Sequence, residues 1–168
     1  SCGVDAIVAE GFEAGGHNGR EETTTMCLVP DVAKTINVPL IAAGGIIDGK
    51  SMLAAMILGA DGVQMGTRFV ASKESSAHEN FKDIVLKAKE GDTRLTLKEI
   101  TPVRMMKNKF FQELEELYKT SPTKEQLLNK LGRGRAKLGM FEGDLESGEL
   151  EIGQASSQIS NVFTAKEI

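Results

Sequence analysis

Two clusters of glycine and small residues could bind a phosphate group. Residues 42–46 read Ala-Ala-Gly-Gly-Ile, and residues 65–68 read Met-Gly-Thr-Arg. Backbone N–H groups that converge on one point, with no β-carbons in the way, bind a doubly charged anion well. The Thr67 hydroxyl could donate a further hydrogen bond, and Arg68 could add positive charge. Either cluster alone is most simply a tight turn, but two clusters at the ends of successive predicted strands favour a phosphate site.

A histidine in a third glycine-rich segment could transfer protons. Residues 10–19 read EGFEAGGHNG, so little apolar packing would occupy the ring of His17. The unperturbed pKa of a histidine, about 6.5, suits proton transfer near neutrality. A plain surface histidine is the alternative, but the position after a predicted strand, at the same end as both glycine clusters, favours catalysis. The second histidine, His78, opens a predicted helix and is expected to be a surface or packing residue.

Other chemistries find less support in the sequence. Glu10 and Glu13 could form a carboxylate pair for hydrolysis of a sugar substrate. Aromatic residues make up only 5% of the chain and tryptophan is absent, however, so few side chains could stack against a sugar ring. No spacing of His, Cys or Asp matches a metal site, and none is predicted. Cys2 and Cys27 are too few for a disulfide scaffold, which favours a reducing cytoplasm.

Three short apolar runs would position the glycine clusters and His17. They are residues 6–10, 39–43 and 62–66, and each is too continuously apolar for a strand with one face in water. They are therefore predicted as strands of a parallel sheet that is covered on both faces. Residues 28–36 and 51–58 are predicted as the intervening helices, an alternation typical of parallel β/α units. A repeated Gly-x-Asp lead before the first and third strands suggests a repeated barrel or solenoid.

The last hundred residues have a helical texture. Apolar stripes and a capping-box pattern predict helices over residues 74–89, 103–117 and 123–131. Residues 93–97 could be extended, and residues 142–160 are predicted as loop and turn before a last short helix. The sequence thus divides into a β/α part, residues 1–72, and a mainly helical cap with a C-terminal tail, residues 73–168.

Composition limits the classes of protein that fit. The chain has 168 residues, 40% of them hydrophobic and 26% charged, and its formal net charge is −4. These values are typical of one soluble domain, without a membrane span, and argue against a nucleic-acid binder that works by whole-surface attraction. Basic stretches near residues 104–109 and 130–137 are expected to be solvated faces, with a dock for an acidic or phosphorylated partner as the alternative.

Three segments, residues 10–19, 38–46 and 59–69, resemble the nitronate monooxygenase (formerly 2-nitropropane dioxygenase) family in sequence and in order. That family includes the flavin-dependent enoyl-(acyl-carrier-protein) reductase II. Residues 71–78 and 142–148 resemble the same group. The resemblance implies an FMN-dependent enzyme of the α/β class with a TIM-barrel (β/α)8 fold.

The resemblance also implies roles for individual residues. The residues expected to contact the cofactor are Gly15, Gly16, Ala43, Gly44, Gly45, Gln64, Met65, Gly66 and Thr67. Of these, the glycine pair at 44–45 and residues 66–67 would hold the FMN phosphate, and the segment at 15–16 would let the flavin approach. His17 matches the catalytic histidine of the family.

Two activities of the family share every motif named here. In the first, NAD(P)H reduces FMN, hydride passes to an enoyl thioester of fatty-acid synthesis, and His17 protonates or polarises the enolate side. In the second, a nitronate is oxidised with O2, and His17 is the base or hydrogen-bond donor. A small-molecule or acyl-carrier-protein-bound substrate, a homodimer and a cytoplasmic location are expected.

The predicted strands account for only part of a barrel. A TIM barrel needs eight strands and typically about 250 residues, whereas the three strands predicted here match the last three β/α units of the family. A free-standing partial barrel would leave sheet edges and apolar faces open. The chain is therefore expected to be the C-terminal portion of a longer protein, with the N-terminal part of the barrel missing. The alternative is a non-catalytic module that binds flavin or phosphate, or a folding fragment that awaits its other part.

Overall fold

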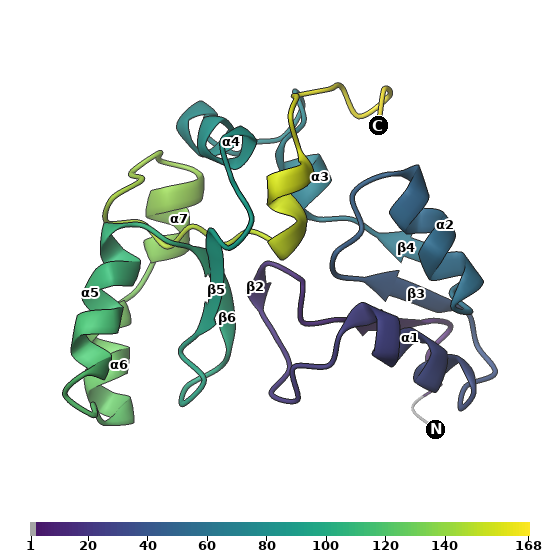
Figure 1. The fold of residues 1–168 in the computed structure, drawn as a ribbon, viewed down its shortest axis with the longest axis horizontal. Helices are drawn as coiled ribbons and strands as arrows, with labels where there is room; N and C mark the ends of the chain where they lie inside the picture. The colour runs from purple at the N-terminus through teal and green to yellow at the C-terminus, as the bar shows by residue number, and fades with distance from the viewer. Residues whose placement is uncertain (1–2) are drawn as a thin grey trace.

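The computed structural model describes residues 3–168, and within that range the chain is an α/β structure with two three-stranded sheets (Figure 1). The first sheet is parallel and has the order β1 (Ile7–Glu10), β3 (Leu40–Ala43), β4 (Gly62–Gln64). Glu10 pairs with Ala43, and Ala43 pairs with Gln64, so the three strands end at the same edge. The parallel strands predicted from the apolar runs are confirmed.

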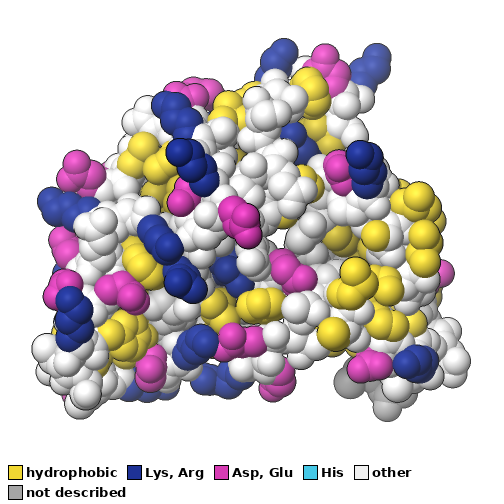
Figure 2. Space-filling model, viewed as in Figure 1, with side chains coloured by type: hydrophobic (Ala, Val, Ile, Leu, Met, Phe, Trp, Pro, Cys, Tyr) yellow, Lys and Arg dark blue, Asp and Glu magenta, His cyan; other side chains and the backbone are white. Residues whose placement is uncertain are grey.

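Two helices cover one face of this sheet. They are α1 (Thr25–Ala33) and α2 (Gly49–Ile57). Val29 of α1 and Ala55 of α2 are buried against Ala9, Leu40 and Ala42, which form the core between helices and sheet. Hydrophobic side chains also gather on the outer surface over these helices (Figure 2), and α2 exposes Leu53 and Ile57.

Helix α1 begins three residues earlier than the sequence predicted. A helix over residues 28–36 would hold Pro30 in its first turn, where the missing N–H costs nothing, but Pro30 lies in the interior of α1. The helix starts earlier because the Thr24 side chain accepts a hydrogen bond from the Cys27 N–H and so provides the N-terminal cap.

The opposite face of the parallel sheet is only partly covered within the described residues, where Ala43 is buried on it, so the prediction of a sheet covered on both faces is wrong for this part of the chain. Val8, Glu10 and Gln64 are exposed, and Val8 retains 49% of its accessible surface. The strands β1 and β4 each have one neighbour and one unpaired edge in residues 3–168. Much of this face and these edges are therefore open.

The second sheet joins distant parts of the chain. The two-residue strand β2 (Gly16–His17) pairs antiparallel with β6 (Val103–Met106), which pairs antiparallel with β5 (Thr93–Thr96). The extended segment expected near residues 93–97 is confirmed. The helix predicted over residues 103–117 is wrong at its start, because Val103–Met106 forms the buried central strand and helix α5 (Lys109–Tyr118) begins only after its cap, Asn108.

The remaining elements are short helices. They are α3 (Thr67–Val70), α4 (Glu79–Leu86), α6 (Lys124–Leu131), α7 (Arg135–Met140) and the 3-10 helix η1 (Gln154–Gln158). In Figure 1, α5, α6 and α7 lie on the side of the molecule away from the parallel sheet, and η1 lies between the two sides. The capping box predicted for α6 is confirmed. Among residues 3–168, no helix has the length and apolar character that a membrane crossing requires.

Candidate active site

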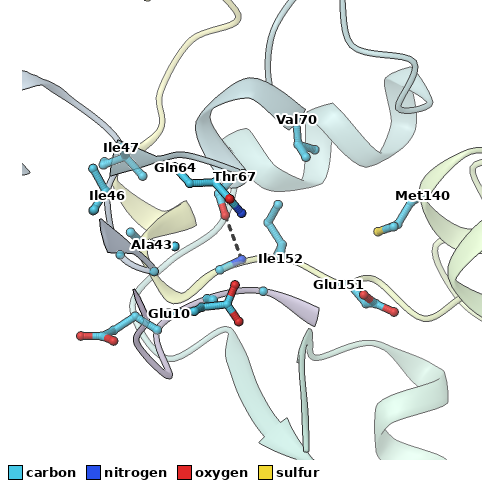
Figure 3. A pocket seen from close by; sticks show the side chains of 18 residues that line it. Glu10, Ala43, Ile46, Ile47, Gln64, Thr67, Val70, Met140, Glu151 and Ile152 are labelled. Carbon is cyan, nitrogen blue, oxygen red and sulfur yellow. Dashed lines mark hydrogen bonds between the residues drawn. The ribbon is translucent and has the colours of Figure 1, made fainter. Parts of the chain in front are cut away.

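A cavity of about 220 Å³ lies at the C-terminal edge of the parallel sheet (Figure 3). The sheet and its following loops form one side, and the segment from Glu151 to Gly153 closes another. Seven of the residues expected to contact a cofactor line it, namely Gly15, Ala43, Gly44, Gly45, Gln64, Gly66 and Thr67. The ends of β3 and β4 therefore meet in one place, as the alignment of parallel strands requires.

Residues with unpaired hydrogen-bond donors line this cavity. Within the described part of the chain, the backbone N–H groups of Gly45 and Gly66 donate to no other residue. The Thr67 hydroxyl oxygen accepts a hydrogen bond of 3.0 Å from the Gly153 N–H (Figure 3), and this leaves its own hydrogen free to donate. Backbone amides and a hydroxyl of this kind are the groups that bind a phosphate without a positive side chain.

The glycines around the cavity serve different purposes. Gly66 belongs to the cavity lining, and a β-carbon placed on it would meet nothing within 4 Å. A β-carbon on Gly15 would lie 2.4 Å from the carbonyl carbon of Ile152, and one on Gly44 would lie 2.5 Å from the Gly11 oxygen. Gly15 and Gly44 thus allow chain segments to approach each other, whereas Gly66 leaves room for a ligand.

Two residues of the expected cofactor set lie outside the cavity lining. The side chain of Met65 packs against the core between the parallel sheet and its helices. Gly16 is buried in β2, and the position of its missing β-carbon is 2.6 Å from Oε2 of Glu151. In this structure Met65 therefore fills the core, and Gly16 makes room for a carboxylate.

His17 lies next to the cavity rather than in its wall. It is the exposed second residue of β2 and pairs with Val103 of β6. Its loop is held by Asn18, whose side-chain amide donates to the Ala14 oxygen at 3.0 Å and to the Gly16 oxygen at 2.9 Å. The other histidine, His78, caps α4 by accepting a hydrogen bond from the Asn80 N–H, a packing role that agrees with expectation.

Carboxylates rather than cations surround the cavity. Glu10, Glu13 and Glu151 line it, and its described lining contains no Lys or Arg. Burial raises the pKa of both Glu10 and Glu151, which favours their neutral forms. The Glu13 carboxylate accepts hydrogen bonds from the Thr25 N–H at 3.0 and 3.1 Å, so its charge is directed toward the start of α1.

The expectation that Arg68 adds positive charge to the phosphate site is wrong. Its guanidinium is buried and donates to the backbone oxygens of Asn161, at 2.6 Å, and Ala71, at 3.1 Å. It also lies 5.6 Å from the ring centroid of Phe163. Arg68 therefore fixes the C-terminal segment, and among the described lining residues the groups that could bind an anion are neutral amides and the hydroxyl.

Sequence reasoning missed the segment from Glu151 to Gly153, which it assigned to a loop-rich tail. The Gln154 N–H donates to the backbone carbonyl oxygen of Glu13 at 2.8 Å, and this bond brings the tail to the cavity. Gly153 was a sequence feature that could have indicated a close approach of two segments, because a β-carbon there would lie 2.6 Å from Oγ1 of Thr67. Contacts between residues so far apart in the chain leave no periodic trace in the sequence.

These residues fit the phosphate end of FMN. The free N–H groups of Gly45 and Gly66, the Thr67 hydroxyl and the open space beside Gly66 form a cradle for an anion. The volume of about 220 Å³ is below the roughly 300–1,000 Å³ typical of sites that enclose a whole small ligand. The described residues are thus suited to hold part of such a cofactor.

Comparison with known proteins decides the family. The family model described as nitronate monooxygenase matches residues 1–168, the full length of the chain. The chain belongs to the nitronate monooxygenase family. A probable nitronate monooxygenase of Staphylococcus saprophyticus is 41% identical over 153 residues, which cover 83% of this chain and 43% of that protein.

Solved structures of related proteins share the fold. FabK from Thermotoga maritima is 42% identical, with a TM-score of 0.87, over 98% of this chain and 52% of that one. Nitroalkane oxidase from Streptomyces ansochromogenes is 29% identical, with a TM-score of 0.75, over 98% of this chain and 49% of that one. The chain spans about half the length of the curated relatives it matches.

Proposed function

We propose that the complete protein is an FMN-dependent oxidoreductase that uses NAD(P)H to reduce the double bond of an enoyl thioester carried by acyl-carrier protein. The observation that carries the proposal is the cradle in which the N–H groups of Gly45 and Gly66 and the Thr67 hydroxyl have no acceptor of their own. Membership of the nitronate monooxygenase family supports a flavin as the ligand.

The residues of this chain would then have distinct tasks. Bound FMN supplies hydride transfer between the nicotinamide and the substrate. The cradle amides hold its phosphate, and Ala43 and Gln64, at the ends of β3 and β4, line the same cavity. His17 donates the proton that the enolate side of the reduced thioester requires. Asn18 keeps the loop of His17 in place through its two amide hydrogen bonds.

We further propose that the parallel sheet forms the last three β/α units of a TIM barrel. The partly uncovered face with Val8, Glu10 and Gln64 and the unpaired edges of β1 and β4 support this, because further strands would pair with those edges and enclose that face. Residues 1–72 would belong to the barrel and residues 73–168 to the cap and tail. Dimerisation and a cytoplasmic location stay predictions.

The charge of the cavity is compatible with both activities. Glu10, Glu13 and Glu151 line it, but burial favours the neutral forms of Glu10 and Glu151, and the Glu13 carboxylate accepts from the Thr25 N–H. Oxidation of alkyl nitronates with O2 is the second candidate, since the curated relatives are named probable nitronate monooxygenases.

The test uses the complete protein in two assays. We expect crotonyl thioester to stimulate NAD(P)H oxidation well above the oxygen background, and alkyl nitronates to cause little oxygen uptake. No stimulation by the thioester would refute the reductase proposal, and rapid oxygen uptake would favour nitronate oxidation. A colourless preparation that takes up no FMN would refute both activities.

A further inference from the structure

Arg104 belongs to the basic stretch near residues 104–109, but it is not part of a solvated face. It lies in β6, the central strand of the second sheet, and retains only 4% of its accessible surface. An arginine stays protonated in a folded protein, and a buried charge of this kind is stable only where its donors find acceptors. Neither the expected solvated face nor a dock for an acidic partner therefore applies to Arg104.

The main acceptor of the Arg104 guanidinium lies in the loop that follows β1. Nε and Nη2 both donate to the backbone carbonyl oxygen of Phe12, at 3.0 and 2.9 Å. Among the described residues, no other group donates to this oxygen. Nη1 donates to Oγ1 of Thr93 on the neighbouring strand β5 at 3.3 Å, and the guanidinium lies 5.1 Å from the centroid of the Phe12 ring. The guanidinium thus binds one carbonyl with two N–H groups and is itself oriented by β5.

The backbone of Arg104 holds the other end of the same loop. Arg104 pairs with Gly16 where β6 lies antiparallel to β2. One residue therefore contacts the loop twice, at Phe12 through its side chain and at Gly16 through its backbone. Residues 13–15, which lie between these two points, all line the cavity. Arg104 itself does not line it, so any effect of Arg104 on a ligand must pass through this loop.

We propose that Arg104 is a positioning residue, which fixes the loop of residues 12–16 at both ends and so holds one wall of the cavity in the geometry that FMN requires. The inference rests on the proposed function of the cavity as the FMN site. Arginine suits this task because its planar group presents two N–H donors to one oxygen, whereas lysine offers a single ammonium group on a flexible chain. The proposal adds no chemical step to the reaction.

The direct test is hydrogen–deuterium exchange of the complete protein, with and without FMN, in a peptide that contains residues 12–18. Local opening of this loop requires the bonds between Arg104 and the Phe12 oxygen to break. In Arg104→Lys the charge is kept but the paired donors are lost, so we expect exchange in this peptide to become about tenfold faster or more. Exchange in β3 should stay within about twofold of the wild type.

The matched control is Arg68→Lys. Arg68 is also buried, also donates to backbone oxygens and also lies beside a phenylalanine ring, but it holds the C-terminal segment. Arg68→Lys should leave exchange of residues 12–18 within about twofold of the wild type. An unchanged rate in Arg104→Lys, or an equal increase in the control, would overturn the proposal, because the loop would then respond only to a general loss of stability.

A second variant decides the question if Arg104→Lys does not fold. Thr93→Val removes the acceptor of Nη1 but leaves both bonds to the Phe12 oxygen possible. Because the guanidinium is then less firmly oriented, exchange of residues 12–18 should become about two- to tenfold faster. An unchanged rate in Thr93→Val would then overturn the proposal.

Cofactor binding and turnover give the functional readout. Arg104→Lys should raise the Kd for FMN about tenfold or more, whereas Arg68→Lys should leave it within about threefold. At saturating FMN, kcat of Arg104→Lys should stay below that of the wild type, because the loop continues into β2 and His17. Faster loop exchange with an unchanged Kd and an unchanged kcat would contradict the positioning role. If the wild-type protein binds no flavin, the proposed function fails, whereas exchange without FMN still decides whether Arg104 holds the loop.

Discussion

The substitutions Gly66→Ala and Gly44→Ala should separate the ligand role of the glycine clusters from their packing role. Gly66 has φ of −89° and ψ of −67°, which alanine adopts without strain, and its β-carbon would meet nothing within 4 Å. Gly44 has φ of +92°, and its β-carbon would lie 2.5 Å from the Gly11 oxygen. We expect Gly66→Ala to impair FMN binding and Gly44→Ala to impair folding.

The structure gives the size of each effect. In the absence of cofactor, Gly66→Ala should leave the free energy of unfolding within about 1 kcal/mol of the wild type. Its methyl group would occupy space beside the phosphate and disturb a hydrogen bond to a charged group, which is worth about 1.5–3 kcal/mol, so the Kd for FMN should rise about 10- to 150-fold. Gly44→Ala should lower the free energy of unfolding by about 2–4 kcal/mol through backbone strain and steric overlap.

The assay is urea unfolding of the FMN-free proteins combined with fluorescence titration of FMN. Equal FMN affinity in Gly66→Ala and the wild type would refute the position of the cradle. A loss of stability in Gly66→Ala as large as that in Gly44→Ala would show that the space beside Gly66 is needed for folding rather than for a ligand.

Three further substitutions test separate parts of the site. His17→Ala should lower kcat by about 100-fold or more, while the FMN content, measured by absorbance, stays within error of the wild type. Loss of the flavin would show that His17 has a structural role instead. Arg68→Met should lower the free energy of unfolding by roughly 2–4 kcal/mol, because backbone oxygens such as that of Asn161 lose their donor. The Kd for FMN should stay within about threefold of the wild type. A larger rise in Kd would show that Arg68 does contribute to the phosphate site. Burial and the neighbouring Glu151 raise the pKa of Glu149 to about 7 in the folded protein. The folded state therefore keeps this proton at pH values at which the unfolded state has already lost it. The contribution of this proton to the free energy of unfolding is complete below the unfolded pKa and is lost as the pH rises through about 7. In urea unfolding the stability of Glu149→Gln relative to the wild type should rise by roughly 2 kcal/mol from about pH 4 to about pH 8, and a difference that does not change with pH would contradict the raised pKa.

The sequence predicted the parts of the fold that depend on local pattern. Continuous apolar runs that lead into glycine located all three parallel strands, and because such strands end at one edge, the clusters at residues 44–45 and 66–67 were expected to meet. They line the same cavity. The Thr123–Gln126 capping box likewise located α6, since both of its hydrogen bonds are made within four residues.

Contacts across long stretches of sequence could not be predicted in this way. Val103 and Met106 have helical spacing with the residues that follow, yet they form a strand because β2 and β5 pair with both edges of β6. Arg68 follows directly after the cradle, but its guanidinium binds Asn161, which lies 93 residues later. Glu151 reaches the site through the bridge to Met105 and through the hydrogen bond from Gly153 to Thr67. In each case a tertiary contact determines the outcome, and local propensity does not.

The central claim is that backbone amides and one hydroxyl at the ends of β3 and β4 bind the phosphate of FMN. The most direct measurement compares the Kd values of FMN and riboflavin for the complete protein, because the two ligands differ only in that phosphate. Two or three hydrogen bonds to a charged group predict that FMN binds at least about 100-fold more tightly than riboflavin. Equal affinity for the two flavins would contradict the claim.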